Sequence, residues 1–266
     1  MNTTDGFDLG PVLAWLTANE ERVARQLSWI TQLADDYSNV VGMENVQIRP
    51  SEITKVLSLF QGPAQERSVL RNIVGKPPTW FAVGTTSDRP IPTEDRLKAM
   101  CPTAIVPGYT DIVSWTPEKK VSDIWLYRIP EVPDRIATFM LVHALIHEYS
   151  HTILNPLWFC GKEPYVIDVP GCTEYTGEAF MMMFAHEAAK HDPISHYAAA
   201  YRPFPDDPSD KQFIRNVGEE LCESVAAYFM GFIYCNDPVR CWAPFAGRPI
   251  VKLLVEHFLR GVHKTD

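Results

Sequence analysis

The sequence lacks the segments that mark membrane-spanning, exported and nucleic-acid-binding proteins. It contains no stretch of about eighteen uncharged apolar residues, which argues against an ordinary transmembrane helix. Residues 1–8 do not combine a basic segment with an apolar run, so no signal peptide is predicted. Lys and Arg form no cluster and the net charge is −9, so the basic surface of a nucleic-acid-binding protein is missing. We therefore expect a cytoplasmic protein with no nucleic acid or membrane partner; leaderless secretion and the oligomeric state stay open.

The sequence also lacks a metal-binding spacing of its cysteines. The six cysteines are scattered through 266 residues without a Cys-x-x-Cys pair. A chain of this length, with 46% hydrophobic residues, can bury a core without disulfides. We therefore expect free thiols. Cys235 and Cys241, which bracket a loop containing Pro238, are the pair that could form a disulfide or bind a metal ion instead.

The sequence does contain one motif with a clear chemical meaning, His-Glu-x-x-His at residues 147–151. Asp134 can cap a helix that then meets neither Gly nor Pro until Pro156, so we predict a mostly buried helix through the motif. Residues four apart share a helical face, so His147 and His151 can bind the same ion. Glu148 lies beside them and can reach a water molecule on that ion. The motif therefore predicts a zinc (Zn²⁺) site with Glu148 as general base.

The histidine pair is an incomplete set of ligands. A catalytic zinc ion usually takes three protein ligands and leaves one position for water. Two later stretches supply carboxylates in the same pattern, Glu-x-x-small-acid: Glu174 with Glu178, and Glu219 with Glu223. A metal-bound histidine usually donates its second N–H to a carboxylate or carbonyl, a role open to Glu178 or Glu223.

These residues resemble the zincin metallopeptidases. In the gluzincin group the motif is followed by a helix whose first Glu binds zinc and whose next acid braces a histidine, and the stretch from Glu174 to Glu178 is similar to that pattern. A fainter similarity to the deuterolysin-like aspzincins rests on residues 171–175 and Ser150, with Glu in place of Asp. Both resemblances imply Glu174 as the third ligand. The alternatives are Glu219, Glu223 and Glu178. The resemblance covers residues 139–180 and a possible second stretch at 219–229.

The rest of the chain alternates helical and strand patterns. Helical spacing of apolar residues at 10–37, 51–60 and 63–74 predicts a helical N-terminal lobe over residues 1–76. Further helices are expected at about 173–190, 193–201, 211–234 and 249–262, and strands at 80–83, 103–106, 110–115 and 123–129. We therefore expect an α+β, mostly helical fold, with a zincin-like metallopeptidase domain and a small sheet over residues 77–266. The two parts should pack as one unit.

These residues together predict a zinc-dependent metallopeptidase acting on a peptide or protein substrate. Glu148 would accept the proton of a zinc-bound water as that water attacks a carbonyl. Residues 124–129, which precede the motif helix, could pair with the extended substrate backbone. A Tyr or His usually helps to hold the oxyanion; the candidates are Tyr175, His186, His191, Tyr201 and Tyr228. Two alternatives stay open: a zinc hydrolase of a small amide, and a non-catalytic zinc-containing interaction protein.

Overall fold

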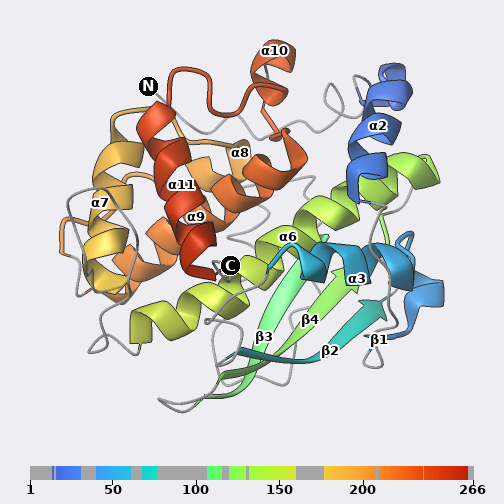
Figure 1. Ribbon diagram of the computed structural model, residues 1–266, viewed down its shortest axis with the longest axis horizontal. Helices are drawn as coiled ribbons and strands as arrows, with labels where there is room; N and C mark the ends of the chain where they lie inside the picture. The colour runs from blue at the N-terminus through green and yellow to red at the C-terminus, as the bar shows by residue number, and fades with distance from the viewer. Residues whose placement is uncertain are drawn as a thin grey trace.

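Figure 1 shows the chain as a computed structural model. The structure describes residues 14, 16–30, 40–60, 68–76, 107–115, 120–129, 132–159, 177–207, 210–235 and 237–262. Among these residues, no helix has both the length and the apolar character needed to cross a membrane.

The strands form one mixed sheet. They are β1 (Val40–Val41), β2 (Ser68–Lys76), β3 (Gly108–Trp115) and β4 (Lys120–Tyr127), in the spatial order β1-β2-β4-β3. β2 is parallel to both of its neighbours, and β3 is antiparallel to β4. In the described part of the chain, β3 therefore has a strand partner on one side only. β4 lies between two strands, so the prediction that residues 124–129 pair with substrate is wrong, because both edges of that strand are already occupied.

The helices lie before, between and after the strands. They are α2 (Glu20–Ile30), η1 (Met43–Asn45, a 3-10 helix), α3 (Pro50–Ser58), α6 (Asp134–Phe159), α7 (Gly177–Ala189), α8 (His196–Ala199), α9 (Lys211–Met230), α10 (Pro238–Cys241) and α11 (Pro249–Val262). The predicted mostly helical α+β fold is confirmed at this level. Two of the predicted strands, at 80–83 and 103–106, lie outside the described residues.

Helix α6 is the centre of the fold. It runs between the sheet on one side and the group formed by α7, α8, α9 and α11 on the other (Figure 1). Between residues 136 and 154 all side chains are buried except those of Thr138, Glu148 and His151, which are partly exposed. On the sheet side, the buried Lys120 of β4 donates a hydrogen bond to the backbone oxygen of His151 at 3.1 Å. The motif helix is therefore fixed within the core, and two of its three partly exposed side chains belong to the motif.

Strand β2 corrects the prediction of an all-helical N-terminal lobe. Residues 68–76 form a strand where a helix over 63–74 was predicted. The register of β2 against β4 shifts between Leu70 and Asn72, which leaves Arg71 as the extra residue of a bulge. Because of the bulge, Leu70 and Ile73 are both buried although they are three residues apart, a spacing that imitates a helix. The sheet therefore contains strands from both predicted parts of the chain.

Candidate metal centre

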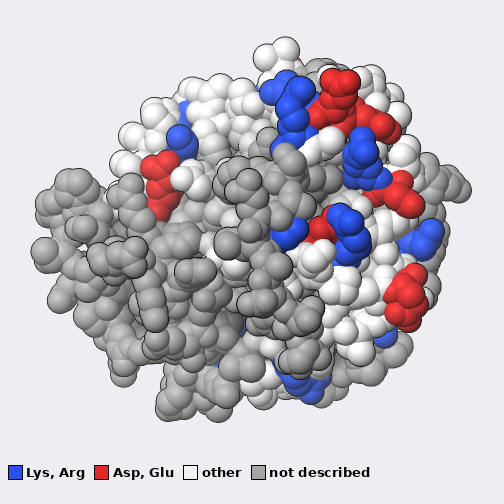
Figure 2. Space-filling model, turned by 45° about the vertical axis from the view of Figure 1, so that its right-hand side comes forward, with Lys and Arg blue, Asp and Glu red and all other residues white. Residues whose placement is uncertain are grey.

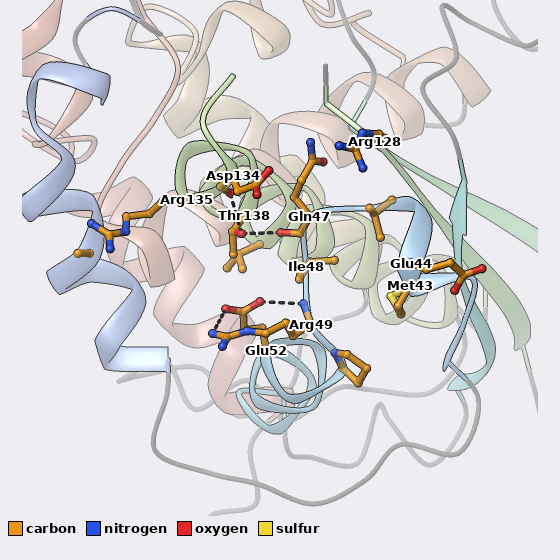
Figure 3. Close-up of a pocket in the computed structure, with 14 residues that line it drawn as sticks. Met43, Glu44, Gln47, Ile48, Arg49, Glu52, Arg128, Asp134, Arg135 and Thr138 are labelled. Atoms are coloured by element: carbon orange, nitrogen blue, oxygen red, sulfur yellow. Dashed lines mark hydrogen bonds and ion pairs between the residues drawn. The ribbon is translucent and has the colours of Figure 1, made fainter. Parts of the chain in front are cut away.

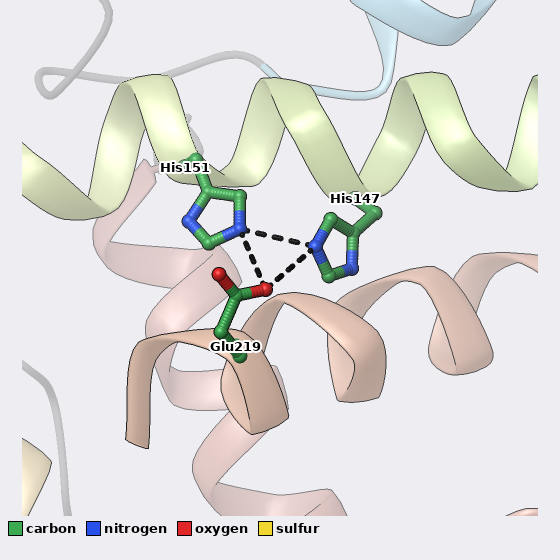
Figure 4. Close-up of side chains that lie close together, drawn as sticks. All are labelled: His147, His151 and Glu219. Atoms are coloured by element: carbon green, nitrogen blue, oxygen red, sulfur yellow. Dashed lines mark hydrogen bonds and ion pairs between the residues drawn. The ribbon is translucent and has the colours of Figure 1, made fainter. Parts of the chain in front are cut away.

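Two helices bring three potential metal ligands together. His147 and His151 lie one turn apart on α6, and Glu219 lies on α9, which packs directly against α6 (Figure 4). The Nε2 atoms of the two histidines are 3.0 Å apart. Oε2 of Glu219 lies 3.2 Å from Nε2 of His147 and 3.3 Å from Nε2 of His151. These three residues form a group that could hold a metal ion.

The geometry of this group agrees with a tetrahedral ion. Zinc binds imidazole nitrogen and carboxylate oxygen at about 2.0–2.1 Å, which separates neighbouring ligand atoms of a tetrahedron by roughly 3.3 Å. The triangle formed by the two Nε2 atoms and Oε2 has edges of 3.0, 3.2 and 3.3 Å. Three bonds of ordinary length can therefore be made at once, and a fourth position remains open. Several metals accept this donor set, so the geometry by itself does not identify the ion.

The electrostatics of the group favour a positive charge at its centre. Burial opposes the charged imidazole of His147, yet hydrogen bonds with Glu219 and Glu223 raise its pKa well above the ordinary value. Burial would raise the pKa of the Glu219 carboxyl, but the charge of His151 and the hydrogen bonds of both histidines lower it well below the ordinary value. Two carboxylates thus stabilise a cation between them. A bound metal ion would supply that charge and leave the imidazoles neutral.

Glu223 contacts the second ring nitrogen of His147. It lies one turn after Glu219 on α9, and its Oε1 is 2.9 Å from Nδ1 of His147. This contact is close enough for an ion pair between the carboxylate and the His147 ring. Farther back, the His143 ring packs edge-on against Tyr234, with ring centroids 4.9 Å apart. Burial lowers the pKa of His143 to about 4, so this histidine is neutral at pH 7.

A buried ion pair fixes α9 beside the centre. Arg202 donates two hydrogen bonds to the Glu220 carboxylate, from Nε at 2.6 Å and from Nη2 at 2.7 Å. The same carboxylate accepts a hydrogen bond from the backbone N–H of Ile194. Arg202 also donates to the backbone oxygen of Ala188 at the end of α7. These contacts anchor α9 at Glu220, the residue that follows Glu219. They therefore restrict a rotation of α9 that would move the Glu219 carboxylate away from the histidines.

The carboxylate of Glu148 lies against the edge strand β3. The hydroxyl of Thr110 is 2.7 Å from Oε2 of Glu148 and 2.9 Å from its backbone oxygen. Gly108 provides the space for this side chain, since a Cβ atom there would lie 2.9 Å from Cγ of Glu148. The general base predicted from the motif is therefore positioned by two residues of the neighbouring strand.

A pair of tyrosines borders the histidines. The Tyr197 ring, on α8, stands edge-on to the His147 ring with centroids 5.5 Å apart; the residue as a whole is 39% exposed, but its hydroxyl end is buried. Its hydroxyl lies 3.0 Å from that of Tyr201. Burial of the phenol and the negative charge of Glu219 raise the pKa of Tyr197, so the phenol is protonated at pH 7. Tyr197 can therefore donate a hydrogen bond beside the centre.

A separate cavity of about 820 Å³ opens at the beginning of α6 (Figure 3). Asp134, Arg135 and Thr138 of that helix line it, together with residues of η1 and α3. Its lining includes none of the motif residues. The charged side chains Arg49 and Glu52 are paired with each other at 2.7 Å. On the face brought forward in Figure 2, which includes the α2 and α3 side, described charges of both signs are interspersed. Among the described residues, the group of side chains that could hold a metal ion is the histidine group, and it lies outside this cavity.

The predicted site residues can now be placed. The structure brings His147 and His151 together with Glu219, which was an alternative third ligand, and sets Glu223 in the predicted supporting position. Glu174, the preferred third ligand, lies outside the described residues, as does the side chain of Glu178. Sequence reasoning missed Tyr197 and Thr110, since neither residue belongs to a recognisable pattern.

The five residues predicted to hold an oxyanion lie in different surroundings. Tyr201 contacts Tyr197, His186 is exposed on α7, and Tyr228 packs against Phe229 and Phe245. His191 is partly exposed just after α7, and Tyr175 lies outside the described residues. Tyr197, which contacts His147, is therefore the better candidate for this role.

Comparison of the chain with models of known families, with curated proteins and with solved structures finds no match.

Proposed function

We propose that the protein is a zinc-dependent metallopeptidase. One observation carries the proposal: Nε2 of His147, Nε2 of His151 and Oε2 of Glu219 converge to within 3.3 Å of one another, next to the carboxylate-bearing Glu148. Two histidines, one carboxylate and an adjacent acid are what zinc-assisted hydrolysis needs. A non-catalytic metal site would have no use for the partly exposed Glu148.

The donor set favours zinc over other ions. Two neutral imidazoles with one carboxylate form a three-ligand set found at catalytic zinc sites, whereas calcium and magnesium prefer oxygen ligands throughout. When bound, zinc would lower the pKa of a water molecule in the open position and polarise the substrate carbonyl. His147, His151 and Glu219 would hold it, and Glu223 would orient the His147 ring.

The surrounding side chains have separate roles in the proposed reaction. Glu148 accepts a proton from the attacking water and delivers it to the leaving amine. Thr110 donates a hydrogen bond that keeps the Glu148 carboxylate oriented. Tyr197 donates its phenolic hydrogen to the oxygen that becomes negatively charged in the transition state. All three roles use contacts or positions that exist in the folded protein before substrate binds.

The position of β3 supports a peptide substrate rather than a small amide. This strand contacts Glu148 through Thr110 and has no strand partner on its outer side among the described residues. The backbone N–H and C=O groups of an edge strand can pair with an extended peptide. A substrate paired there would run past Glu148, which is how an edge strand can direct a scissile bond to the base.

The test begins with metal content. Full-length protein purified without chelator should contain one zinc ion per chain by elemental analysis, and cleave a denatured protein or a peptide library. A chelator should abolish cleavage, and added zinc should restore it. Protein that carries essentially no zinc, and takes up none when zinc is supplied, would rule out the proposal.

Glu148→Gln is the matched control because it keeps the size of the side chain and the metal ligands but removes the base. It should retain zinc and lose cleavage by several orders of magnitude. If this variant is as active as the parent, Glu148 is not the base. If the parent hydrolyses small amides but no peptide, the hydrolase chemistry stands and the choice of substrate is wrong.

A further inference from the structure

The thiols of Cys235 and Cys241 touch each other in the segment that follows α9. Their Sγ atoms are 3.2 Å apart, and both residues are buried. Within the described chain, the group of metal-ligating side chains that could hold an ion is that of His147, His151 and Glu219. The two cysteines are not part of it, and no third described ligand joins them. The pair therefore does not resemble a metal site.

The backbone around the two cysteines holds the thiols in this position. The N–H of Ile233 donates to the backbone oxygen of Cys241 at 2.9 Å, which brings the two ends of the segment together. Asp237 caps the intervening α10 by accepting hydrogen bonds from the N–H groups of Val239 and Arg240. The Cys241 thiol lies 3.1 Å from the backbone oxygen of Cys235 and 3.2 Å from the Cys235 sulfur, and its single hydrogen can bond to either acceptor. These hydrogen bonds hold the two ends of the segment, and with them the two cysteines, close together.

The surroundings also favour reaction at one of the two sulfurs. The hydrogen bond from the Cys241 thiol lowers the pKa of Cys235, and the nearby positive charge of Arg240 acts in the same direction. A lower pKa increases the fraction of thiolate, which is the reactive form in disulfide exchange. The short α10, which ends at Cys241, connects the two cysteines, and its Val239 is 80% exposed. A helix of one turn at the surface opens locally at little cost, which gives a small reagent access.

We infer that Cys235 and Cys241 form a reversible disulfide by exchange with a small-molecule disulfide of the glutathione class. The Cys235 thiolate attacks one sulfur of oxidised glutathione, forms a mixed disulfide and releases one glutathione thiolate. The Cys241 thiol then loses its proton to solvent and attacks the Cys235 sulfur, which forms the internal bond and releases the second glutathione. Two protein thiols are oxidised and one small disulfide is reduced to two thiols.

This modification site is independent of the proposed metal chemistry, although the two are linked in space. Tyr234 directly precedes the loop that the bond closes, residues 235–241, and its ring packs against His143, one turn before His147. The backbone oxygen of Tyr234 also accepts a hydrogen bond from the N–H of His196, the first residue of α8. Oxidation would close the loop covalently next to this residue.

The experiment exposes reduced full-length protein to oxidised glutathione under native conditions, then blocks all remaining thiols in denaturant. Trypsin cleaves after Arg240 and so separates the two cysteines, which lets mass spectrometry detect a peptide pair joined by a disulfide. We expect Cys235 and Cys241 to be joined, and added dithiol reductant to release them. Cys222, a buried free cysteine on α9, should stay reduced and serves as the internal control.

Variants test the order of the two steps. Cys241→Ser should retain glutathione as a mixed disulfide on Cys235, because the second thiol is missing. Cys222→Ser should form the internal bond as the parent does. The inference is overturned if Cys235 and Cys241 remain fully blockable after native treatment, if either one pairs with another cysteine, or if the bond forms only in denaturant.

Discussion

Thr110 and Glu148 are joined by a hydrogen bond of 2.7 Å between the Thr110 hydroxyl and Oε2 of the carboxylate. The same hydroxyl lies 2.9 Å from the backbone oxygen of Glu148, and its single hydrogen can serve one of these acceptors at a time. This contact links the edge strand to the motif helix at the residue proposed as the base. It also gives the first prediction, because it can be removed without touching any proposed metal ligand.

Replacing Thr110 by valine should lower kcat while leaving zinc content unchanged. A hydrogen bond to a charged group contributes about 1.5–3 kcal/mol, which corresponds to a loss of roughly tenfold to a hundredfold if it acts on the base in the transition state. Thr110→Ser keeps the hydroxyl and should retain most activity. Steady-state kinetics with zinc analysis on the same samples checks this. Equal activity of the valine variant and the parent would show that Thr110 does not position Glu148.

Replacing Glu219 by glutamine should weaken zinc binding strongly, because the neutral amide is a poorer ligand of similar size. Glu223→Gln should weaken it by about 10–100-fold, the usual effect of losing a group that orients a metal-bound histidine. We expect the loss of zinc affinity in Glu219→Gln to be larger than the loss in Glu223→Gln. Competition with a chromophoric chelator measures both affinities.

The same assay separates Glu219 from Glu174 as the third ligand. Glu174→Gln should bind zinc as the parent does if Glu219 completes the set. A Glu174 variant that loses zinc while Glu219→Gln keeps it would mean that the ligand comes from the nearer stretch. Circular dichroism of each variant excludes loss of folding as the reason.

Replacing Tyr197 by phenylalanine should reduce kcat with little change in KM or zinc content. Loss of one donor to a developing oxyanion typically lowers kcat by about 10²–10³-fold. Tyr228→Phe is the matched control, since this residue packs between Phe229 and Phe245 and should be dispensable for catalysis. If the two variants have the same kcat, Tyr197 is not the donor.

The pair of Asp123 and Arg71 should make folding stability sensitive to acid. Burial raises the pKa of the Asp123 carboxyl, but hydrogen bonds from Arg71 and Asn72 outweigh burial and keep it below the ordinary value. A carboxyl with a lowered folded-state pKa stabilises the fold above its unfolded value near 3.9, and this contribution is lost as the pH falls below that value.

Asp123→Asn should therefore reduce the free energy of unfolding by about 1 kcal/mol at neutral pH, a modest value because Arg71 is half exposed. The difference from the parent should shrink as the pH is lowered to about 3. Urea denaturation of both proteins at several pH values measures it. A difference that grows with acidity would contradict the assigned direction of the pKa.

Much of the centre could be predicted because it depends on local spacing. His147 and His151 share a helical face in any helix, and Glu219 and Glu223 do so for the same reason. The packing partner of α6 could not be read from the sequence, because two stretches carry the same Glu-x-x-small-acid pattern. The packing of α6 against α9 is a long-range contact, and it places Glu219 beside His147 and His151.

The errors in the predicted fold also come from long-range contacts that the sequence does not reveal. Leu70 and Ile73 suggested a helix because a bulge at Arg71 restores a spacing of three on a strand. A strand is predicted at 123–129, and residues 123–127 of it belong to β4. The place of this strand inside the sheet depends on its antiparallel pairing with β3 and its parallel pairing with β2. Strand pairing of this kind depends on contacts between distant segments, so the local sequence of neither segment predicts it.

The sequence distance across the centre sets an order of assembly. Glu219 follows His151 by 68 residues, so the three donor atoms meet only after α9 has packed on α6. A nascent chain that has reached the motif, but not yet α9, would hold an ion through two imidazoles alone and exchange it rapidly. Loading would then be a late event that follows folding, and the loaded ion would act as a cross-link between two distant segments of the chain.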